Sequence, residues 1–435
     1  MHGTPASTAP SRNLFGQPPG LTVLFLTNMW EQFSYFGMRA LLVYYMTRQL
    51  MLGQVQASFV YGAYTACAYF TPILGGMIAD RWLGKRRAVM LGATIMATGH
   101  FMMAFEPLFY VALATIALGN GLFLPSLPSQ INDLYAPGDP RRGWAYNVYY
   151  LGINIGGFLA PLICGTLGEI YGWHYGFGAA GIGMFVGLLI YLFGQRHLPP
   201  ERLSLPRTQG DAQVSPGDEK RIWMVLAAVG LCVTVFRGAY EQVGNTVALW
   251  ADSGIDRQFG SLTIPMTWFQ ALNPLLVMML TPPLLSVWRK RADAGQEAAP
   301  ARRMTQGALI VALAYALLAI VSWQAGNDRA DWLWLVAFFV LFTTGELFIL
   351  PTGLGLFARL APPRLGATTV AAWYLAIFAG SLSAGLVGML WSRMEPGAYF
   401  SLLSAIAVAA AGLLYLLDPA VRRVDRSSTR RQPHC

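Results

Sequence analysis

Five ionisable side chains interrupt long apolar stretches of this sequence. Moving a charged side chain to the middle of a bilayer costs ~2.5 kcal/mol or more, so such residues usually face a cavity and have a function. Facing acids and bases form salt bridges, and protonation of a carboxylate releases its partner. The alternative is a set of fixed ion pairs that only orient helices. The five residues are Glu31, Arg39, Arg237, Glu241 and Glu346.

Helical spacing places four of these residues in two pairs. Glu31 and Arg39 are eight residues apart, or about two turns, so they share one face of a helix. Arg237 and Glu241 are four residues apart and also share a face. We therefore expect these four residues to couple protons to gating. Glu346 has no basic neighbour in its own stretch.

The elements that must position these residues are membrane-spanning helices. The 435 residues are 55% hydrophobic and only 12% charged, about half the charge of a soluble protein. Apolar stretches of ~20 residues cross a bilayer core, and in lipid each must be a helix to satisfy its backbone. The predicted helices are Leu21–Leu50, Val55–Ala79, Ala88–Phe105, Leu108–Ile131, Trp144–Leu167, Trp173–Gly194, Ile222–Trp250, Leu262–Trp288, Met304–Trp323, Trp332–Ala358, Ala367–Trp391 and Ala398–Leu417.

The distribution of basic residues predicts the orientation. With the N-terminus inside, 24 of the 30 lysines and arginines fall in the tails and the even-numbered loops. This pattern sets both termini in the cytoplasm of a bacterial inner membrane. The net charge of +9 therefore reflects topology and anionic lipid, and we expect no nucleic acid partner. The four cysteines have no metal-binding spacing, so we expect no metal and no cofactor.

A hydrophilic stretch divides the chain into two similar halves. We predict a tail at 1–20, a six-helix bundle at 21–194, a cytoplasmic linker at 195–221, a second bundle at 222–417 and a basic tail at 418–435. Glu31-Gln32 recurs as Glu241-Gln242, and "GNGLFLP" recurs as "GELFILP". Such a duplication predicts a site between the bundles, near the membrane midplane.

Several segments resemble a known family. The loop "GGMIADRWLGKRR" resembles the loop between helices 2 and 3 of the major facilitator superfamily. The longer segments are similar to the proton-dependent oligopeptide transporters (POT/PTR), the peptide branch of that superfamily. This resemblance implies an all-α membrane protein with the major facilitator fold, about twelve helices in two bundles, and proton-driven import of di- and tripeptides. The segments are Trp30–Met46, Gly138–Met184, Tyr240–Asp252, Ile264–Pro274 and Gly345–Ala367.

The resemblance also implies roles for single residues. Glu346 would receive the peptide amino terminus, and Arg39 with Asn154 would hold the peptide ends. Glu241 would couple protons to gating. Four further residues would contact the peptide side chains and backbone, namely Tyr35, Tyr69, Asn273 and Trp373.

The sequence departs from the family pattern at charged positions. Where the family has Glu-x-x-Glu-Arg-Phe, Asn28 replaces the first Glu and Gln32 replaces the Arg. Leu124 replaces the lysine that would pair with Glu241, which leaves Arg237 or Arg39 as its partner. The missing lysine also favours peptide-like or modified compounds over ordinary dipeptides.

These departures leave other functions open. The protein would be a secondary transporter and a monomer whose partners are a peptide-like solute, protons and the bilayer. Alternatively, it is an uncoupled facilitator or an exporter, or a membrane sensor that no longer transports. An intramembrane enzyme is disfavoured, since the sequence contains no metal cluster, nucleophile elbow or paired aspartates.

Overall fold

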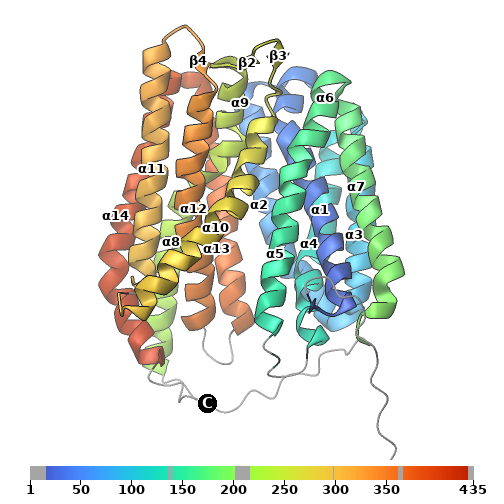
Figure 1. Cartoon of the computed structure of the whole chain (residues 1–435), viewed down its shortest axis with the longest axis vertical. Helices are drawn as coiled ribbons and strands as arrows, with labels where there is room; N and C mark the ends of the chain where they lie inside the picture. Colours follow the sequence, from blue (N-terminus) through green and yellow to red (C-terminus); the bar gives the residue numbers. More distant parts are fainter. Residues whose placement is uncertain are drawn as a thin grey trace, which may run out of the picture.

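The computed structural model describes residues 16–135, 139, 141–200, 216–296, 298–360 and 366–429. Long helices, most of them steeply inclined along the long axis, make up nearly all of it (Figure 1). The first half contains α1 (Pro19–Tyr44), η2 (Tyr45–Gln49), α2 (Gln54–Ile78), η3 (Ala79–Leu83), α3 (Lys85–Met102), η4 (Glu106–Leu108), α4 (Phe109–Ser129), η5 (Asn132–Leu134), α5 (Arg141–Ala160), η6 (Pro161–Gly165), α6 (Thr166–Ile170), α7 (Trp173–Gly194) and η7 (Gln195–His197).

The second half repeats this arrangement and adds four short strands at one end. It contains α8 (Pro216–Tyr240), η8 (Glu241–Gly244), α9 (Thr246–Ser253), β1 (Ile255–Asp256), β2 (Gln258–Phe259), β3 (Leu262–Thr263), α10 (Trp268–Asp293), α11 (Pro300–Ala325), β4 (Ala330–Asp331), α12 (Leu333–Leu360), α13 (Gly366–Gly388), η9 (Trp391–Arg393) and α14 (Pro396–Thr429). Strand β1 pairs in parallel with β4, and β2 pairs antiparallel with β3.

The helical segments correspond in order to the twelve predicted helices, with three clear differences in bounds. The seventh begins at Pro216 and not at Ile222, so it starts inside the predicted linker. The eighth begins at Trp268 and not at Leu262, because Leu262 lies in strand β3, where an apolar side chain is exposed. The last continues to Thr429, well past Leu417. Hydropathy falls at Asp418, but its ion pair with Arg422 at 2.7 Å is an i,i+4 pair that a polar helix favours.

Nine helices of the described chain are long and apolar enough to cross a membrane. The remaining three long segments, α1 to α3, are of similar or slightly shorter length but more polar. Helix α1 contains Glu31 and Arg39, and α3 begins with three basic residues. Polarity in a bundle helix is tolerated where the polar side chains face the protein interior, and Glu31 is only 1% exposed.

Close glycine contacts hold equivalent helices together in the two halves. In the first half, α3 meets α4 where Gly92 lies against Gly119, and an ideal Cβ on Gly92 would be 2.7 Å from the Gly119 carbonyl oxygen. In the second half, α11 meets α12 in the same way, with Gly307 against Gly345 at 2.6 Å. Small residues allow such close approach of helices in membranes. The duplication seen in the sequence is therefore also present in the packing.

Polar capping marks the start of α5, just outside the membrane-spanning region. The Arg141 backbone N–H donates to Asp139 Oδ1 at 2.9 Å, and the Arg141 guanidinium donates to the same carboxylate. These hydrogen bonds, the guanidinium bond first, hold the pKa of the Asp139 carboxyl below its usual value. Aspartate at this position satisfies a backbone donor that the first helical turn leaves free.

The two bundles are joined near the end of the molecule where the strands lie (Figure 1). The Tyr44 hydroxyl of α1 donates to the Ala248 carbonyl of α9 at 2.8 Å. Helices α2 and α13 touch through backbone, since an ideal Cβ on Gly62 would lie 2.6 Å from the Gly385 nitrogen. These contacts hold the two bundles against each other along this seam.

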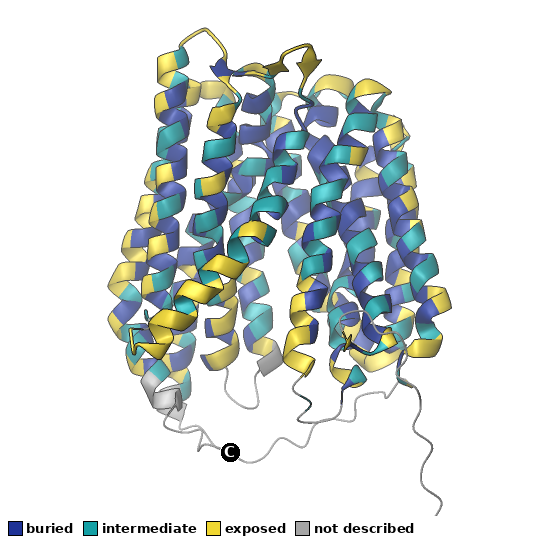
Figure 2. Cartoon of the chain, in the orientation of Figure 1, coloured by how far each residue is buried: buried dark blue, intermediate teal, exposed yellow. Residues whose placement is uncertain are grey.

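Charged groups reinforce the same end. Glu169 of α6 accepts hydrogen bonds from the backbone nitrogens of Met266 and Thr267, at 3.0 and 2.9 Å, and so caps the start of α10. Arg48 of η2 is paired with Asp252 of α9. Toward the opposite end, α10 leans outward and becomes exposed (Figures 1 and 2). Three prolines, Pro274, Pro282 and Pro283, lie inside α10 and favour such bending.

Candidate binding site between the two bundles

A cavity of about 340 Å³, into which several charged and polar side chains project, lies between the bundles. This volume is within the ~300–1,000 Å³ range of small-molecule sites. Its walls come from α1, α2, α4, α5 and η6 of the first half and from α8, η8, α10, α12 and α13 of the second. Several lining residues are equivalent in the sequence repeat: Glu31 with Glu241, Asn120 with Glu346, and Tyr150 with Tyr374.

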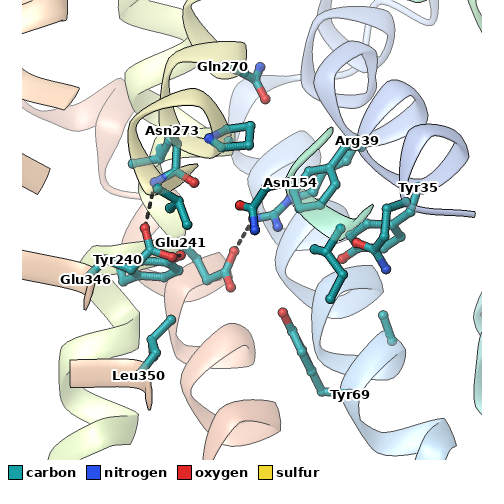
Figure 3. Close-up of a pocket in the computed structure, with 18 of the residues that line it drawn as sticks. Tyr35, Arg39, Tyr69, Asn154, Tyr240, Glu241, Gln270, Asn273, Glu346 and Leu350 are labelled. Carbon is teal, nitrogen blue, oxygen red and sulfur yellow. Dashed lines mark hydrogen bonds and ion pairs between the residues drawn. The ribbon is translucent and has the colours of Figure 1, made fainter. Parts of the chain in front are cut away.

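Glu241 is the centre of the cavity's charge network (Figure 3). It lies in the 3-10 turn η8, where the helix is interrupted before Asn245, and only 1% of its surface is exposed. One carboxylate oxygen is paired with Arg39 of α1, and the other with Arg237 of α8. A single acid therefore joins a cation from each bundle.

Arg237 of α8 is contacted from both bundles, by Tyr69 of α2 in the first and by Tyr240 of its own helix. Its guanidinium carbon lies 5.0 Å from the ring centre of Tyr69 and 5.2 Å from that of Tyr240. Such cation–π contacts contribute about 2 kcal/mol or more when they are shielded from water. Arg237 is 2% exposed and also donates to Ser381 Oγ at 3.3 Å.

Arg39 is the more accessible of the two cations. Its side chain is 14% exposed, and its Nε donates to the Tyr61 hydroxyl at 2.7 Å. Because α1 supplies Arg39 and η8 supplies Glu241, this ion pair breaks whenever the two bundles separate here.

Glu346 faces the cavity with neutral partners. The Tyr240 hydroxyl donates to one of its oxygens at 2.8 Å, and the Asn273 amide donates to the other at 2.6 Å (Figure 3). Asn273 also donates to Thr343 at 3.1 Å, which fixes the amide. No arginine or lysine within the described part of the chain forms an ion pair with Glu346. The carboxylate is therefore available to an external cation.

The first bundle contributes a second unpaired acid. Glu31 accepts a hydrogen bond from the Gln32 amide at 2.6 Å. Nearby, the Asn154 amide donates to the Tyr150 carbonyl at 2.9 Å, and the Tyr35 hydroxyl has no hydrogen-bond partner among the described residues. Both amide and phenol thus retain capacity for a ligand. No group of three potential metal ligands occurs in the described ranges.

All but one of the site residues named from the sequence line this cavity; the exception is Trp373. Its ring is 3% exposed, lies 5.2 Å from the ring of Phe357 and packs against Gly353. The prediction that Trp373 faces the site is therefore wrong, and its neighbour Tyr374 lines the cavity instead. One residue along a helix rotates the side chain by ~100°, so a one-residue error in register exchanges the core face for the cavity face.

Sequence reasoning missed several polar contributors to the cavity wall. These are Gln32, Asn120, Tyr150, Tyr240, Gln270 and Tyr374. Tyr240 lies three residues after Arg237 and directly before Glu241, so helical periodicity alone would have placed it on the same face. The same spacing links Gln270 to Asn273, three residues later, and would have placed it on the cavity face too.

The chain matches known proteins along almost its whole length. The model of the POT family (PTR2) matches residues 86–204 and 206–402. The uncharacterized transporter YclF of Bacillus subtilis is 31% identical, over 96% of each chain. The peptide transporter YePEPT of Yersinia enterocolitica is 30% identical, over 98% of each chain. A di-/tripeptide transporter of Lactococcus lactis is 28% identical, over 95% of this chain and 97% of its own.

Solved structures have the same arrangement of helices. A peptide transporter POT in complex with sulfate is 28% identical and superposes with a TM-score of 0.85, covering 96% of this chain and 97% of its own. A mutant of a peptide transporter POT in complex with alafosfalin is 27% identical, with a TM-score of 0.87 over 95% and 97% of the two chains. The predicted fold class, a membrane protein with two six-helix bundles of the major facilitator type, is therefore confirmed.

Proposed function

The chain belongs to the POT family, and we propose that it is a secondary active transporter of di- and tripeptides or peptide-like solutes. The curated relatives include peptide and di-/tripeptide transporters, and solved structures of such transporters bind sulfate and alafosfalin. The protein is accordingly a multi-pass membrane protein of a transporter family, and we propose that it has no enzymatic activity. Transport would occur by alternating access, with the two bundles rocking around the central cavity.

The observation that supports this proposal best is the separation of charge within the cavity. Glu346 faces the cavity without a cationic partner. Arg39 from the first bundle and Arg237 from the second share the single carboxylate of Glu241, which leaves an excess of one positive charge in that cluster. A peptide zwitterion is complementary to this pattern: its ammonium would bind Glu346, and its carboxylate would approach the arginines.

Proton coupling follows from the position of Glu241. A proton on this carboxylate would remove its attraction for Arg39, so α1 would be free to move away from η8. Because the pair joins the two bundles, its loss would favour opening at the end that is now closed. The proton therefore acts on the same contact that gates the cavity.

The topology we propose places both termini in the cytoplasm of a bacterial inner membrane. The strand-bearing end, closed by Glu169 and the Arg48–Asp252 pair, would then face outward. The cavity would face the cytoplasm, and the protein would act as a monomer. The distribution of lysines and arginines in the sequence supports this orientation.

One observation favours an uncoupled facilitator or exporter as the second candidate. Arg237 belongs to the same bundle as Glu241, so it would stay paired with the acid after Arg39 had moved away. An acid that always has a counter-ion gains little from a proton. This resident arginine is the strongest argument against coupling at Glu241.

Flux in liposomes tests both candidates. Purified protein is reconstituted, and uptake of labelled Ala-Ala is measured with an acidic exterior and with equal pH on both sides. A coupled importer accumulates the peptide above its external concentration only under the gradient. A facilitator equilibrates the peptide at the same final level in both conditions. If no flux of Ala-Ala or of a modified dipeptide occurs in either condition, the transport function is refuted.

A further inference from the structure

Glu31 is a buried acid that the charge network of the cavity does not use. Its side chain lines the cavity but is only 1% exposed. Among the described residues its hydrogen-bond partner is the neutral amide of Gln32, at 2.6 Å, and no arginine or lysine there is paired with it. Glu241, by contrast, has two arginines.

The surroundings of Glu31 contain no substitute for a cation. The titratable groups that face it from packed helices are the phenols of Tyr64 in α2 and Tyr149 in α5. One turn earlier on α1, the Asn28 amide donates to the Tyr149 carbonyl at 3.2 Å. The α4 residues in the cavity wall are Asn120, a neutral amide, and Leu124, a hydrocarbon. A carboxylate that lies in a cavity wall without a cationic partner can bind a positively charged group of a ligand.

The formal charges of the cavity lead to the same conclusion. Three carboxylates, Glu31, Glu241 and Glu346, face two guanidiniums, so the lining has a formal charge of −1. A dipeptide zwitterion is neutral and leaves that charge uncompensated, and an unpaired charge out of water is costly. Either a proton or a third charged group of the substrate must therefore neutralise the cavity.

We propose that Glu31 binds the cationic side chain of the substrate, so that peptides with a lysine or arginine side chain are preferred. This inference rests on the proposed function, since it assumes that the peptide ends bind Glu346 and the arginines. Glu31 and Arg39 are separated by eight residues of α1, roughly 12 Å along the helix axis. A lysine at the carboxyl-terminal position, whose carboxylate meets Arg39, extends along α1 toward Glu31.

The test compares two dipeptides that differ in charge at one side chain. Binding of Ala-Lys and of Ala-norleucine to purified protein is measured by calorimetry for the wild type, for Glu31→Gln and for a control, Glu395→Gln. The control makes the same chemical change at an exposed position. We expect the wild type and the control to bind Ala-Lys about tenfold more tightly, the size of one charge-assisted hydrogen bond. In Glu31→Gln this preference should disappear, while the affinity for Ala-norleucine is retained.

A second measurement needs only the wild type and so stands even if Glu31→Gln does not fold. Proton exchange on binding is followed with a pH dye in weak buffer. Binding of Ala-norleucine should take up about one proton more than binding of Ala-Lys, because the lysine replaces the proton on Glu31. Equal proton counts for the two peptides, equal affinities, or a preference that survives in Glu31→Gln would each overturn the inference. If neither peptide binds, the proposed function itself fails.

Discussion

Arg39 and Arg237 share one carboxylate from opposite bundles: each is paired with a different oxygen of Glu241. The Arg237 pair lies within one helical turn and moves with its bundle. The Arg39 pair crosses between bundles and must break when they separate. This asymmetry distinguishes a gating contact from a structural one, and it leads to the predictions that follow.

Replacing Glu241 with Gln should abolish accumulation driven by a pH gradient. The amide is neutral at every pH, so protons no longer act on the Arg39 contact. Counterflow, in which labelled peptide exchanges for unlabelled peptide at equal pH, should continue because it requires no net proton movement. Both rates are measured in liposomes beside Glu395→Gln, and pH-driven accumulation that persists in Glu241→Gln would refute the coupling role.

Replacing Arg237 with Met should weaken recognition of the peptide carboxylate. Without Arg237, Glu241 neutralises Arg39, and the cluster of these three residues loses its excess positive charge. The ratio of affinities for Ala-Ala and its carboxyl amide should fall about tenfold, as expected for one charged hydrogen bond. Calorimetry measures both ligands. An unchanged ratio would mean that Arg237 is only structural.

Replacing Glu346 with Gln should remove the preference for a free peptide amine. Wild-type protein should bind Ala-Ala at least about tenfold more tightly than N-acetyl-Ala-Ala, and the variant should bind the two nearly equally. Tyr240→Phe removes one hydrogen bond to the same carboxylate and should leave most of the preference. A full preference in Glu346→Gln would place the amine elsewhere in the cavity.

Replacing Gly62 with Val should prevent closure of the strand-bearing end. The new side chain would meet the backbone of Gly385, and such overpacking costs about 1–3 kcal/mol. We expect a cysteine at Val243, in the cavity wall, to react at least about fivefold faster with an impermeant thiol reagent from that side. Gly178→Val, where a Cβ meets nothing within 4 Å among described atoms, is the control and should not change the rate.

Substitutions at Trp373 and Tyr374 should affect different properties, stability in the first case and transport in the second. Trp373→Ala leaves a void beside Phe357 and should lower the free energy of unfolding by about 3–5 kcal/mol. The protein that folds should keep its KM for peptide. Tyr374→Phe should leave the melting temperature near that of the wild type and raise KM by about two- to tenfold. The reverse result for the two variants would show that Trp373, and not Tyr374, is the residue of α13 that faces the cavity.

Hydropathy, charge and spacing in the sequence were sufficient to predict the number and order of the helices. They were also sufficient to identify the acids and bases that lie within them. These properties are local, because a segment that crosses lipid must bond its own backbone and a buried charge must find a partner. The Arg237–Glu241 pair could therefore be located without a structure, whereas Glu31 and Arg39, which share a helix, are bound to other partners in the fold.

The tertiary structure alone decided which groups meet. From the sequence, Glu241 had Arg237 or Arg39 as its partner, and the fold gives it both. Only the packed helices show that Tyr374 and not Trp373 faces the cavity, and that Glu169 caps α10 across the bundles. The rotation and tilt of each helix depend on how all its neighbours pack, and no single segment of sequence contains that information.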